Sequence, residues 1–324
     1  MEYIRANYFI PDARKFWVRS SVAKIKKYLA ENTIDVILTT GPPHSVHLIG
    51  LALKKSLQIK WLADFRDPWT SLYYNDEFNF SSYAKKKNLA LEQEVLKQAD
   101  KVLTVSNSLR EELQCPNDKI AVVTNGFDGE VQGKPLRKNG KFTISYIGFL
   151  PKQSNPTILW EVLEELVKTN EDFKKDLEIR LTGSISREAN VSIAQHGIDA
   201  YTNITGYVPH EEAIHEQLSA SILLLLVPKT TKAKGIVTGK VFEYLQAKRP
   251  ILAIGPEDGD LAAILNETSA GVISGFENKT SLKNNILNFY RSFQNNTLLC
   301  NSKGIEKYHR RALTKELVEI LKVL

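Results

Sequence analysis

One short stretch of the sequence places a glycine, a lysine and a glutamate at the spacing expected of a phosphate and sugar site. Thr238, Gly239 and Lys240 form a turn into an amphipathic helix, and Glu243 follows one helical turn after Gly239. A helix N-terminus presents unpaired N–H groups and a positive partial charge, so this turn suits a phosphate. Glu243 would then accept hydrogen bonds from sugar hydroxyls beside it. An ordinary helix–strand unit with a solvated Glu243 stays open as the alternative, because such short motifs often occur by chance.

Two polar segments in the first half of the chain follow predicted strands. His44 closes the segment Gly41-Pro-Pro-His, where it would hydrogen-bond a sugar or a phosphate, or else cap a helix as a surface histidine. Asp64, Arg66 and Asp67 follow the next strand, a costly place for charge unless the charge is paired or used. Asp64 and Arg66 can simply form an ion pair, and Asp67 can start a turn. The density of charged and aromatic residues in this segment favours a functional site.

A second glycine–lysine pair follows the first predicted strand of the second half. Gly148 lets a ligand approach the backbone closely, and Lys152 can place a point charge on a phosphate. A solvated loop lysine is the alternative. With Lys240 and helix-terminal amides, Lys152 would offset a diphosphate without a metal or other cofactor.

Missing motifs disfavour several kinds of site and enzyme. The histidines of the sequence lack the spacing of a zinc site. A Ser-His-Asp hydrolase is disfavoured because no Gly-x-Ser-x-Gly turn is present. A dinucleotide dehydrogenase is disfavoured because no Gly-x-Gly-x-x-Gly follows a strand.

Length and composition are those of a water-soluble protein with two domains. The chain has 324 residues, 43% of them hydrophobic and 25% charged. Cys115 and Cys300 are isolated, so no disulfide framework is indicated, and the N-terminus lacks the layout of a signal peptide. These features predict a cytoplasmic protein. A net charge of +6 without a recognised reader motif disfavours nucleic acid as a partner.

The basic residues gather near the N-terminus. Residues 14–29 contain six Lys and Arg residues and no acid, with Val18, Val22, Ile25 and Leu29 at helical spacing. Such a helix can lie on anionic lipid at the inner face of a membrane. It can also pack its apolar stripe on its own domain, which the pattern alone favours.

Strand and helix patterns alternate along the whole chain, which predicts an α/β fold with two parallel sheets. The predicted strands are residues 35–39, 60–64, 101–105, 120–124, 142–148, 178–182, 203–206, 222–227, 250–254 and 271–274. The predicted helices before the C-terminal one are residues 14–30, 44–56, 84–99, 108–114, 157–169, 186–196, 211–220, 240–247 and 261–267. We expect a first domain over residues 1–130, a polar linker over 131–140, a second domain over 141–303 and a C-terminal helix over 304–324. Tandem α/β domains bind ligands in the cleft between them, at the carboxyl ends of the strands.

The stretch Phe242-Glu-Tyr-Leu245, followed by Lys248-Arg-Pro-Ile-Leu-Ala253, resembles the nucleotide-sugar signature of retaining glycosyltransferases of family 4. These enzymes have the GT-B fold, two Rossmann-like domains that face each other across a cleft. The resemblance implies that Glu243 binds the ribose of the donor, that Gly239 and Lys240 meet its diphosphate, and that Lys152 neutralises the leaving group. It also implies that the backbone at Gly206 holds the base, with Tyr207 beside the ring.

The segments that contain His44 and Asp64-Phe-Arg-Asp-Pro-Trp69 resemble the acceptor domain of the same family, in which an acid or histidine near Asp67 faces the reacting sugar. The resemblance therefore implies transfer from a nucleoside diphosphate sugar to a saccharide or lipid-linked acceptor of surface-polysaccharide synthesis, with Asp67, Lys152 and Lys240 in catalysis.

Two departures from the family pattern keep other functions open. A glutamate usual eight residues before Glu243 is Gly235 here, and the opening strand and glycine-rich loop of the family have no counterpart, so we expect an incomplete first domain. A partner subunit that keeps donor binding, one half of a split enzyme, and a sugar-nucleotide epimerase or hydrolase are the alternatives.

Overall fold

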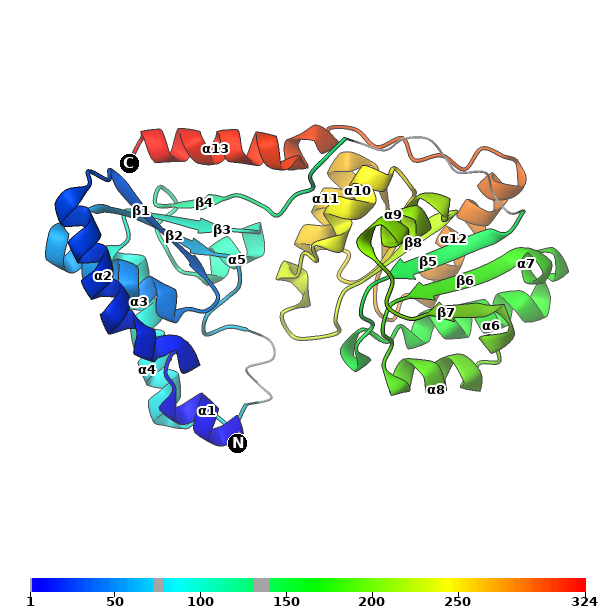
Figure 1. Ribbon diagram of the computed structural model, residues 1–324. Helices are drawn as coiled ribbons and strands as arrows, with labels where there is room; N and C mark the ends of the chain where they lie inside the picture. The colour runs from blue at the N-terminus through cyan, green and yellow to red at the C-terminus, as the bar shows by residue number, and fades with distance from the viewer. Residues whose placement is uncertain (1, 73–77, 131–139) are drawn as a thin grey trace. The chain divides into compact units, whose positions relative to one another are not determined.

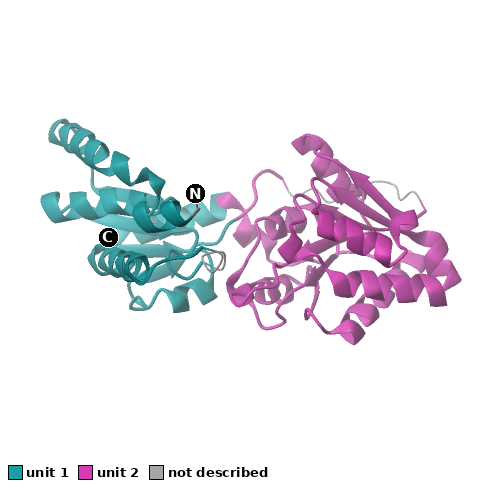
Figure 2. Cartoon of the chain, turned by 90° about the horizontal axis from the view of Figure 1, so that it is seen from below, with its two compact units in different colours: residues 1–125, 311–324 teal, residues 126–310 magenta. Residues whose placement is uncertain are grey.

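The computed structural model describes residues 2–72, 78–130 and 140–324, which fold into two compact units. Unit 1 comprises residues 1–125 and 311–324, and unit 2 comprises residues 126–310 (Figure 2). The C-terminal residues thus return to the first unit. The expected linker, 131–140, lies almost wholly outside the described residues.

Unit 1 is built on a parallel sheet with the strand order β1-β2-β3-β4 (Figure 1). Its strands are β1 (Val36–Gly41), β2 (Lys60–Phe65), β3 (Lys101–Thr104) and β4 (Ile120–Val122). Its helices are α1 (Glu2–Tyr8), α2 (Trp17–Glu31), α3 (Ser45–Leu57), α4 (Ser82–Gln98), α5 (Asn107–Glu112) and most of α13 (Arg310–Lys322).

The alternation of side chains along β2 explains why unit 1 needs the C-terminal helix. Trp61, Ala63 and Phe65 point to one face of the sheet and pack with residues of α3, α4 and α5. Leu62 points to the other face, where its cluster is joined by five partly buried apolar residues near the C-terminus, Leu313, Leu317, Ile320, Leu321 and Leu324. A sheet whose strands follow one another in chain order receives its right-handed crossovers on one face. Helix α13 therefore covers the face that the crossovers leave open.

Unit 2 contains a six-stranded parallel sheet with the order β10-β9-β8-β5-β6-β7. When the six strands are counted from the first, this is the 3-2-1-4-5-6 order of the Rossmann fold. The strands are β5 (Phe142–Ile147), β6 (Leu177–Thr182), β7 (Thr202–Thr205), β8 (Ile222–Leu226), β9 (Ile251–Ile254) and β10 (Gly271–Ser274). The helices are α6 (Thr157–Thr169), α7 (Glu171–Asp176), α8 (Arg187–Gln195), α9 (His210–Ser219), α10 (Lys240–Ala247), α11 (Asp260–Thr268) and α12 (Lys279–Gln294).

The core of unit 2 lies on both faces of this sheet. Along β8, Ile222, Leu224 and Leu226 pack into one hydrophobic cluster. Leu223 and Leu225 pack into the other. A parallel strand covered on both faces reads as a continuous apolar run. Figure 1 shows that helices of unit 2 lie on both sides of the sheet, where they cover the two clusters.

The structure confirms the alternating α/β pattern and each strand that the sequence predicted, with small shifts in bounds. Three helices were not predicted, namely α1, α7 and α12. Helix α12 does carry a signal, because Leu282, Ile286 and Tyr290 are buried at a spacing of four residues. The last helix begins at Arg310 and not at residue 304, since Gly304 has a left-handed φ of 62° and a 3-10 turn follows it.

Helix α2 contains the basic stretch that the sequence singled out. Its apolar stripe is only partly buried, on the side that packs beside α3, and no residue of α2 is fully buried. Phe16 and Trp17 at its start keep 71% and 42% of their surface exposed.

Candidate functional site

Glycine follows the last residue of five of the six strands of unit 2. Gly148, Gly183, Gly206, Gly255 and Gly275 come directly after β5, β6, β7, β9 and β10. All of these strands are parallel, so the glycines lie at one edge of the sheet, where doubly wound proteins bind ligands. An edge without side chains lets a ligand contact the backbone.

Two of these glycines are required by backbone geometry. Gly148 and Gly183 have φ values of +117° and +118°, which other residues rarely adopt. A Cβ on Gly183 would lie 2.5 Å from the carbonyl oxygen of Gly148. The two loops therefore touch backbone to backbone, and the N–H of Gly148 donates to the Thr182 carbonyl at 2.8 Å.

Lys240 occupies the space that Gly148 leaves. A Cβ on Gly148 would lie 2.7 Å from Lys240 Cε and 3.2 Å from Nζ. The ammonium donates to the Tyr146 hydroxyl at 2.6 Å and lies 4.3 Å from the centroid of that ring. Burial lowers the pKa of Lys240 to about 8, partly opposed by Glu243. The sequence predicted Gly148 and Lys240 separately, and the fold brings them together.

Tyr146 binds the Lys240 ammonium as a neutral phenol. Burial raises the pKa of the Tyr146 phenol, so the phenol stays neutral. The hydroxyl donates its proton to the Phe149 carbonyl at 2.7 Å, which leaves its oxygen to accept from Lys240. The ammonium is thereby fixed at the carboxyl end of β5, between β8 and β6, where the strand order reverses.

The other residues that the sequence predicted beside Lys240, namely Thr238, Gly239 and Glu243, lie on helix α10 and just before it. Gly239 is the N-cap of α10 and Thr238 precedes it, its hydroxyl buried and without a hydrogen-bond partner among the described residues. Glu243 is exposed, and one of its carboxylate oxygens accepts from Gln217 Nε2 at 3.2 Å. Gln217 is buried on α9, so it fixes the carboxylate next to the helix start.

Other predicted donor residues lie on exposed loops. Lys152 is in a 3-10 helix, where its ammonium is 3.7 Å from a carboxylate oxygen of Glu188 and its side chain is 71% exposed. Tyr207 is 94% exposed, and a Cβ on Gly206 would meet nothing within 4 Å. Gly235 ends a 3-10 turn, Ala233–Gly235, in the segment before α10.

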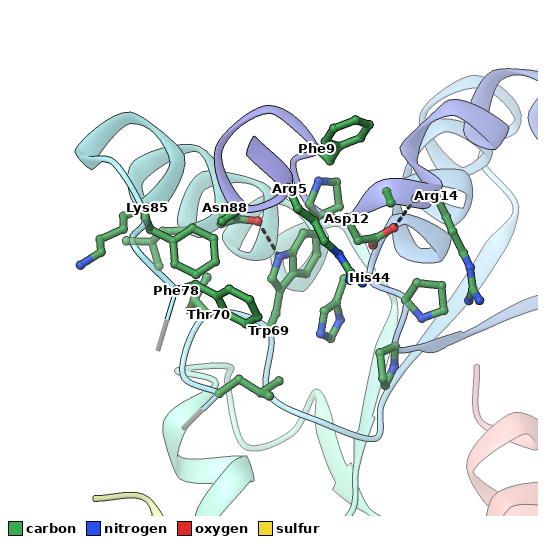
Figure 3. A pocket seen from close by; sticks show the side chains of 18 residues that line it. Arg5, Phe9, Asp12, Arg14, His44, Trp69, Thr70, Phe78, Lys85 and Asn88 are labelled. Carbon is green, nitrogen blue, oxygen red and sulfur yellow. Dashed lines mark hydrogen bonds between the residues drawn. The ribbon is translucent and has the colours of Figure 1, made fainter. Parts of the chain in front are cut away.

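Unit 1 contains a cavity of about 900 Å³ at the carboxyl ends of β1 and β2. Its lining combines residues of α1, of the segment between α1 and α2, of the loops that follow the two strands, and of α4 (Figure 3). Among them are Arg5, Asp12, His44, Trp69 and Asn88. Figure 3 shows Arg5 extending into the cavity between Trp69 and Asp12, toward His44.

His44 lies within this cavity wall and is only 9% exposed, so it is not the surface histidine of the simpler alternative. Its ring stacks on Trp69, with centroids 5.0 Å apart and planes at 4°. Burial lowers its pKa to about 4, so the ring is neutral. The nearby Pro68 backbone opposes this lowering of the pKa. Neither ring nitrogen has a hydrogen-bond partner among the described residues.

His47, one helical turn along α3, is a core residue. It is fully buried and stacks on Phe65 with centroids 4.5 Å apart. Its Nδ1 is 2.9 Å from the Thr39 hydroxyl, which also accepts from Trp61 Nε1 at 2.9 Å. These contacts fix α3 on the sheet.

The loop that carries Trp69 is anchored by two polar residues one turn apart on α4. Asn88 Oδ1 accepts from Trp69 Nε1 at 3.0 Å. The buried Glu92 carboxylate accepts from the Thr70 amide at 3.2 Å and from its hydroxyl at 2.5 Å. These hydrogen bonds from α4 therefore hold the Trp69 ring, on which His44 stacks, in the wall of the cavity.

Of the charged residues before this loop, Asp64 and Arg66 form an ion pair, whereas Asp67 is exposed. Asp64 is buried, accepts from the Thr40 hydroxyl at 3.2 Å and lies 3.6 Å from Arg66, so the ion pair left open by the sequence is present. Arg66 also donates to the Val123 carbonyl at 3.0 Å. Asp67 is exposed, although neighbouring groups displace enough water to raise the pKa of its carboxyl.

Several site residues were not predicted. Asp12 accepts from the amide and hydroxyl of Ser45 at 2.8 and 2.9 Å, which ties the N-terminal segment to the start of α3. No local pattern indicates a partner 33 residues away. Asn88 and Glu92 carried a weak signal as polar residues among the apolar positions of α4. Gly183 had one too, as a glycine directly after a predicted strand.

Metal-binding clusters and membrane spans are both absent from the described part of the chain. Its residues contain no group of three or more His, Cys, Asp and Glu side chains arranged to hold a metal ion. None of its helices combines the length and apolar character needed to cross a membrane.

Comparison with known proteins identifies the fold. Residues 2–131 match the family model described as Glycosyltransferase Family 4. A search of curated proteins finds no significant match. Solved structures do match. The sucrose-phosphate synthase of Thermosynechococcus elongatus is 15% identical, with a TM-score of 0.67 over 95% of this chain and 79% of its own. The lipopolysaccharide outer core galactosyltransferase WaaB is 12% identical, with a TM-score of 0.63 over 95% and 80%.

A third solved structure is the UDP-forming α,α-trehalose-phosphate synthase of Burkholderia xenovorans, in complex with glucose-6-phosphate. It is 9% identical, with a TM-score of 0.61 over 94% of this chain and 77% of its own. At these identities the likeness establishes the fold, which is the GT-B fold that the sequence predicted.

Proposed function

Because the chain has the GT-B fold and matches Glycosyltransferase Family 4 over residues 2–131, we propose that it is a glycosyltransferase. It moves a sugar from a nucleoside diphosphate sugar, bound by unit 2, to a saccharide or lipid-linked acceptor, bound by unit 1. Transfer proceeds with retention at the anomeric carbon and without a metal ion.

The observation that carries this proposal is the position of Lys240. Its ammonium is held over Gly148 at the reversal point of the strand order, beside the first turn of α10. A diphosphate seated on this glycine edge would meet the ammonium, backbone N–H groups and the positive end of a helix together. Such preorganised charge stabilises a leaving diphosphate.

Glu243 supports binding of the nucleoside part. Its carboxylate is exposed, is held by Gln217, and lies one helical turn from the residue that would meet the phosphates. A carboxylate accepts from two neighbouring hydroxyls, as the ribose 2′ and 3′ positions offer. Lys152 is free enough at 71% exposure to exchange Glu188 for a phosphate.

Unit 1 would hold the acceptor in its cavity. The solved trehalose-phosphate synthase with this fold binds glucose-6-phosphate, and a cavity of about 900 Å³ is large enough for a saccharide. His44 would receive an acceptor hydroxyl, and Asp67 would face the reacting sugar. The departing phosphate would take the proton of the acceptor, while the protein supplies position and charge.

Helix α2 is proposed to contact an anionic membrane surface. Exposed Phe16 and Trp17 lie at the start of α2, which also carries basic residues such as Arg19 and Lys24. Aromatic side chains insert at the lipid interface while basic ones meet lipid phosphates. This arrangement would bring unit 1 to a lipid-linked acceptor.

Calorimetry of nucleotide binding tests the donor site. UDP-, GDP-, TDP- and ADP-sugars are titrated into the intact protein, and the one that binds is titrated into Glu243→Ala and the matched Glu211→Ala, another exposed glutamate near a helix start. We expect at least a roughly tenfold loss of affinity in Glu243→Ala alone. Unchanged affinity, or no binding of any nucleotide sugar, would refute the donor site. Turnover without an acceptor would point to an epimerase or hydrolase.

A further inference from the structure

The cavity of unit 1 is cationic as well as apolar. Among the described residues, its lining includes the basic side chains of Arg5, Arg14 and Lys85 and one carboxylate, that of Asp12. In Figure 3, Arg5 extends into the cavity while Arg14 and Lys85 stand at its opposite ends. A partly enclosed cavity lined by charges of one sign concentrates ions of the other sign.

The single carboxylate does not neutralise these cations. Asp12 directs its oxygens to the amide and hydroxyl of Ser45 and to the backbone amide of Arg14. No side-chain ion pair involves Arg5, Arg14 or Lys85 within residues 2–72, 78–130 and 140–324. A guanidinium that projects into a cavity and forms no ion pair with a described residue can bind a carboxylate or a phosphate with two parallel hydrogen bonds.

His44 adds a second requirement on the ligand. It lines the same cavity, is nine-tenths buried, and has no hydrogen-bond partner for either ring nitrogen among the described groups. A neutral imidazole offers one donor and one acceptor, which a hydroxyl group can satisfy. The unpartnered ring lies below Arg5 in Figure 3. A ligand with a hydroxyl next to an anionic group would serve both residues.

The other walls favour a carbon skeleton. Phe9, Phe78 and Phe80 line the cavity and are partly exposed to it. Aromatic rings contact the apolar C–H faces of sugars and the first methylenes of a lipid chain alike. The cavity therefore combines an apolar wall, a hydroxyl partner and an unpaired guanidinium.

From this combination we infer that unit 1 selects acceptors that carry a negative charge, a saccharide with a phosphate or carboxylate group whose anion meets Arg5 and whose neighbouring hydroxyl meets His44. That the bound saccharide is an acceptor rests on the proposed transferase function. The binding of an anionic saccharide at this site does not. Arg5 is a specificity residue in this assignment, with Arg14 and Lys85 adding long-range attraction.

The test compares charged and neutral sugars on the intact protein. Glucose, glucose 6-phosphate, glucuronate and inorganic phosphate are titrated by calorimetry at low and moderate salt. We expect glucose 6-phosphate or glucuronate to bind at least roughly tenfold more tightly than glucose and than inorganic phosphate, and the preference to shrink as salt rises. Equal binding of charged and neutral sugars would overturn the inference.

Two matched variants locate the anion. Arg5→Gln removes the cation that enters the cavity, while Arg110→Gln removes the same charge from α5, which does not line the cavity. The preference for the anionic sugar should fall about tenfold in Arg5→Gln and stay unchanged in Arg110→Gln. Equal losses in both variants would show a non-specific effect of net charge and contradict the site.

A further arm separates soluble from lipid-linked anions. Phosphatidylglycerol vesicles replace the sugars in a sedimentation assay with the same two variants. If Arg5→Gln alone weakens vesicle binding, the anion is assigned to a lipid headgroup. If Arg5→Gln weakens binding of the anionic sugar but not of the vesicles, the anion is assigned to a soluble sugar. No loss in either arm would refute the subsite. Affinity of unit 2 for nucleotide sugar is measured in parallel, because the donor site can fail while this anion site stands.

Discussion

Lys240 Nζ lies 2.6 Å from the hydroxyl oxygen of Tyr146 and 4.3 Å from the centroid of its ring. The two residues are 94 positions apart in the chain and meet at the carboxyl end of β5. Tyr146 therefore places a partly desolvated ammonium at the point of the sheet where the strand order reverses. A cation held in place does not have to be reorganised during the reaction.

The lowered pKa of Lys240 makes donor binding depend on pH. The amine is protonated below about pH 8 and loses its proton as the pH rises through that value. A diphosphate prefers the protonated form, so the Kd should rise above about pH 8, approaching roughly tenfold per pH unit. Calorimetry from about pH 7 to about pH 9.5 measures this. Lys240→Met should bind more weakly with no such rise, and an identical rise in that variant would show that another group titrates.

Replacing Gly148 with alanine should damage both stability and donor binding. Its φ of +117° strains an alanine, and the new Cβ would displace Lys240, whose Cε lies 2.7 Å from that position. We expect a loss of about 1–3 kcal/mol in the free energy of unfolding and weaker nucleotide binding.

Gly197→Ala is the control for this prediction, because Gly197 also has a positive φ, +62°, but a Cβ added there would meet nothing within 4 Å. It should lower stability by about 1 kcal/mol and leave nucleotide affinity intact. Urea unfolding and calorimetry give the two quantities. Parallel losses of affinity in both variants would mean that strain, and not the place of Lys240, matters.

The buried carboxylate of Glu92 should stabilise unit 1. In the native protein Thr70 donates two hydrogen bonds to the Glu92 carboxylate. Glu92→Gln turns an N–H₂ donor toward these donors and should lower the free energy of unfolding by about 1–3 kcal/mol. Glu94→Gln, two residues along α4 in an ion pair of partly exposed side chains, should change stability by less than about 1 kcal/mol. Urea unfolding followed by tryptophan fluorescence reports on both. Equal effects would argue against a supporting role for Glu92.

Membrane contact by α2 should depend on its exposed aromatic residues. Trp17→Ser, made together with Phe16→Ser, should reduce sedimentation with phosphatidylglycerol vesicles, because it removes the apolar part of the contact. Tyr83→Ser, an aromatic residue 70% exposed on α4, serves as the control. Binding to neutral phosphatidylcholine vesicles as strong as to anionic ones would contradict the role of the basic residues.

Local pattern was enough to predict the framework of this protein. Apolar runs such as Ile222–Val227 predicted buried parallel strands, and helical spacing predicted most of the helices between them. These signals are local because a strand or helix is stabilised by the side chains that recur along its own length. The motif around Gly239, Lys240 and Glu243 predicted the start of α10 for the same reason.

The pairing of distant residues came only from the tertiary structure. Tyr146 with Lys240, Asp12 with Ser45, and Trp69 with Asn88 are contacts between segments that the sheets bring together. Neither partner of such a pair has an unusual neighbourhood in the sequence. Their meeting depends on strand order and on the angle at which each helix packs, and these follow from the burial of the whole core.

The sequence by itself determined two α/β units, their strands and the turn into the helix at Lys240, because turn residues and apolar periodicity are properties of short segments. The tertiary structure decided that α13 returns to cover the sheet of unit 1, that Lys240 contacts Tyr146 next to Gly148, and that His44 is buried near Arg5, which forms no ion pair with a described residue. Charge and burial act across space, so the chemistry of both sites is set by residues that only the fold makes neighbours.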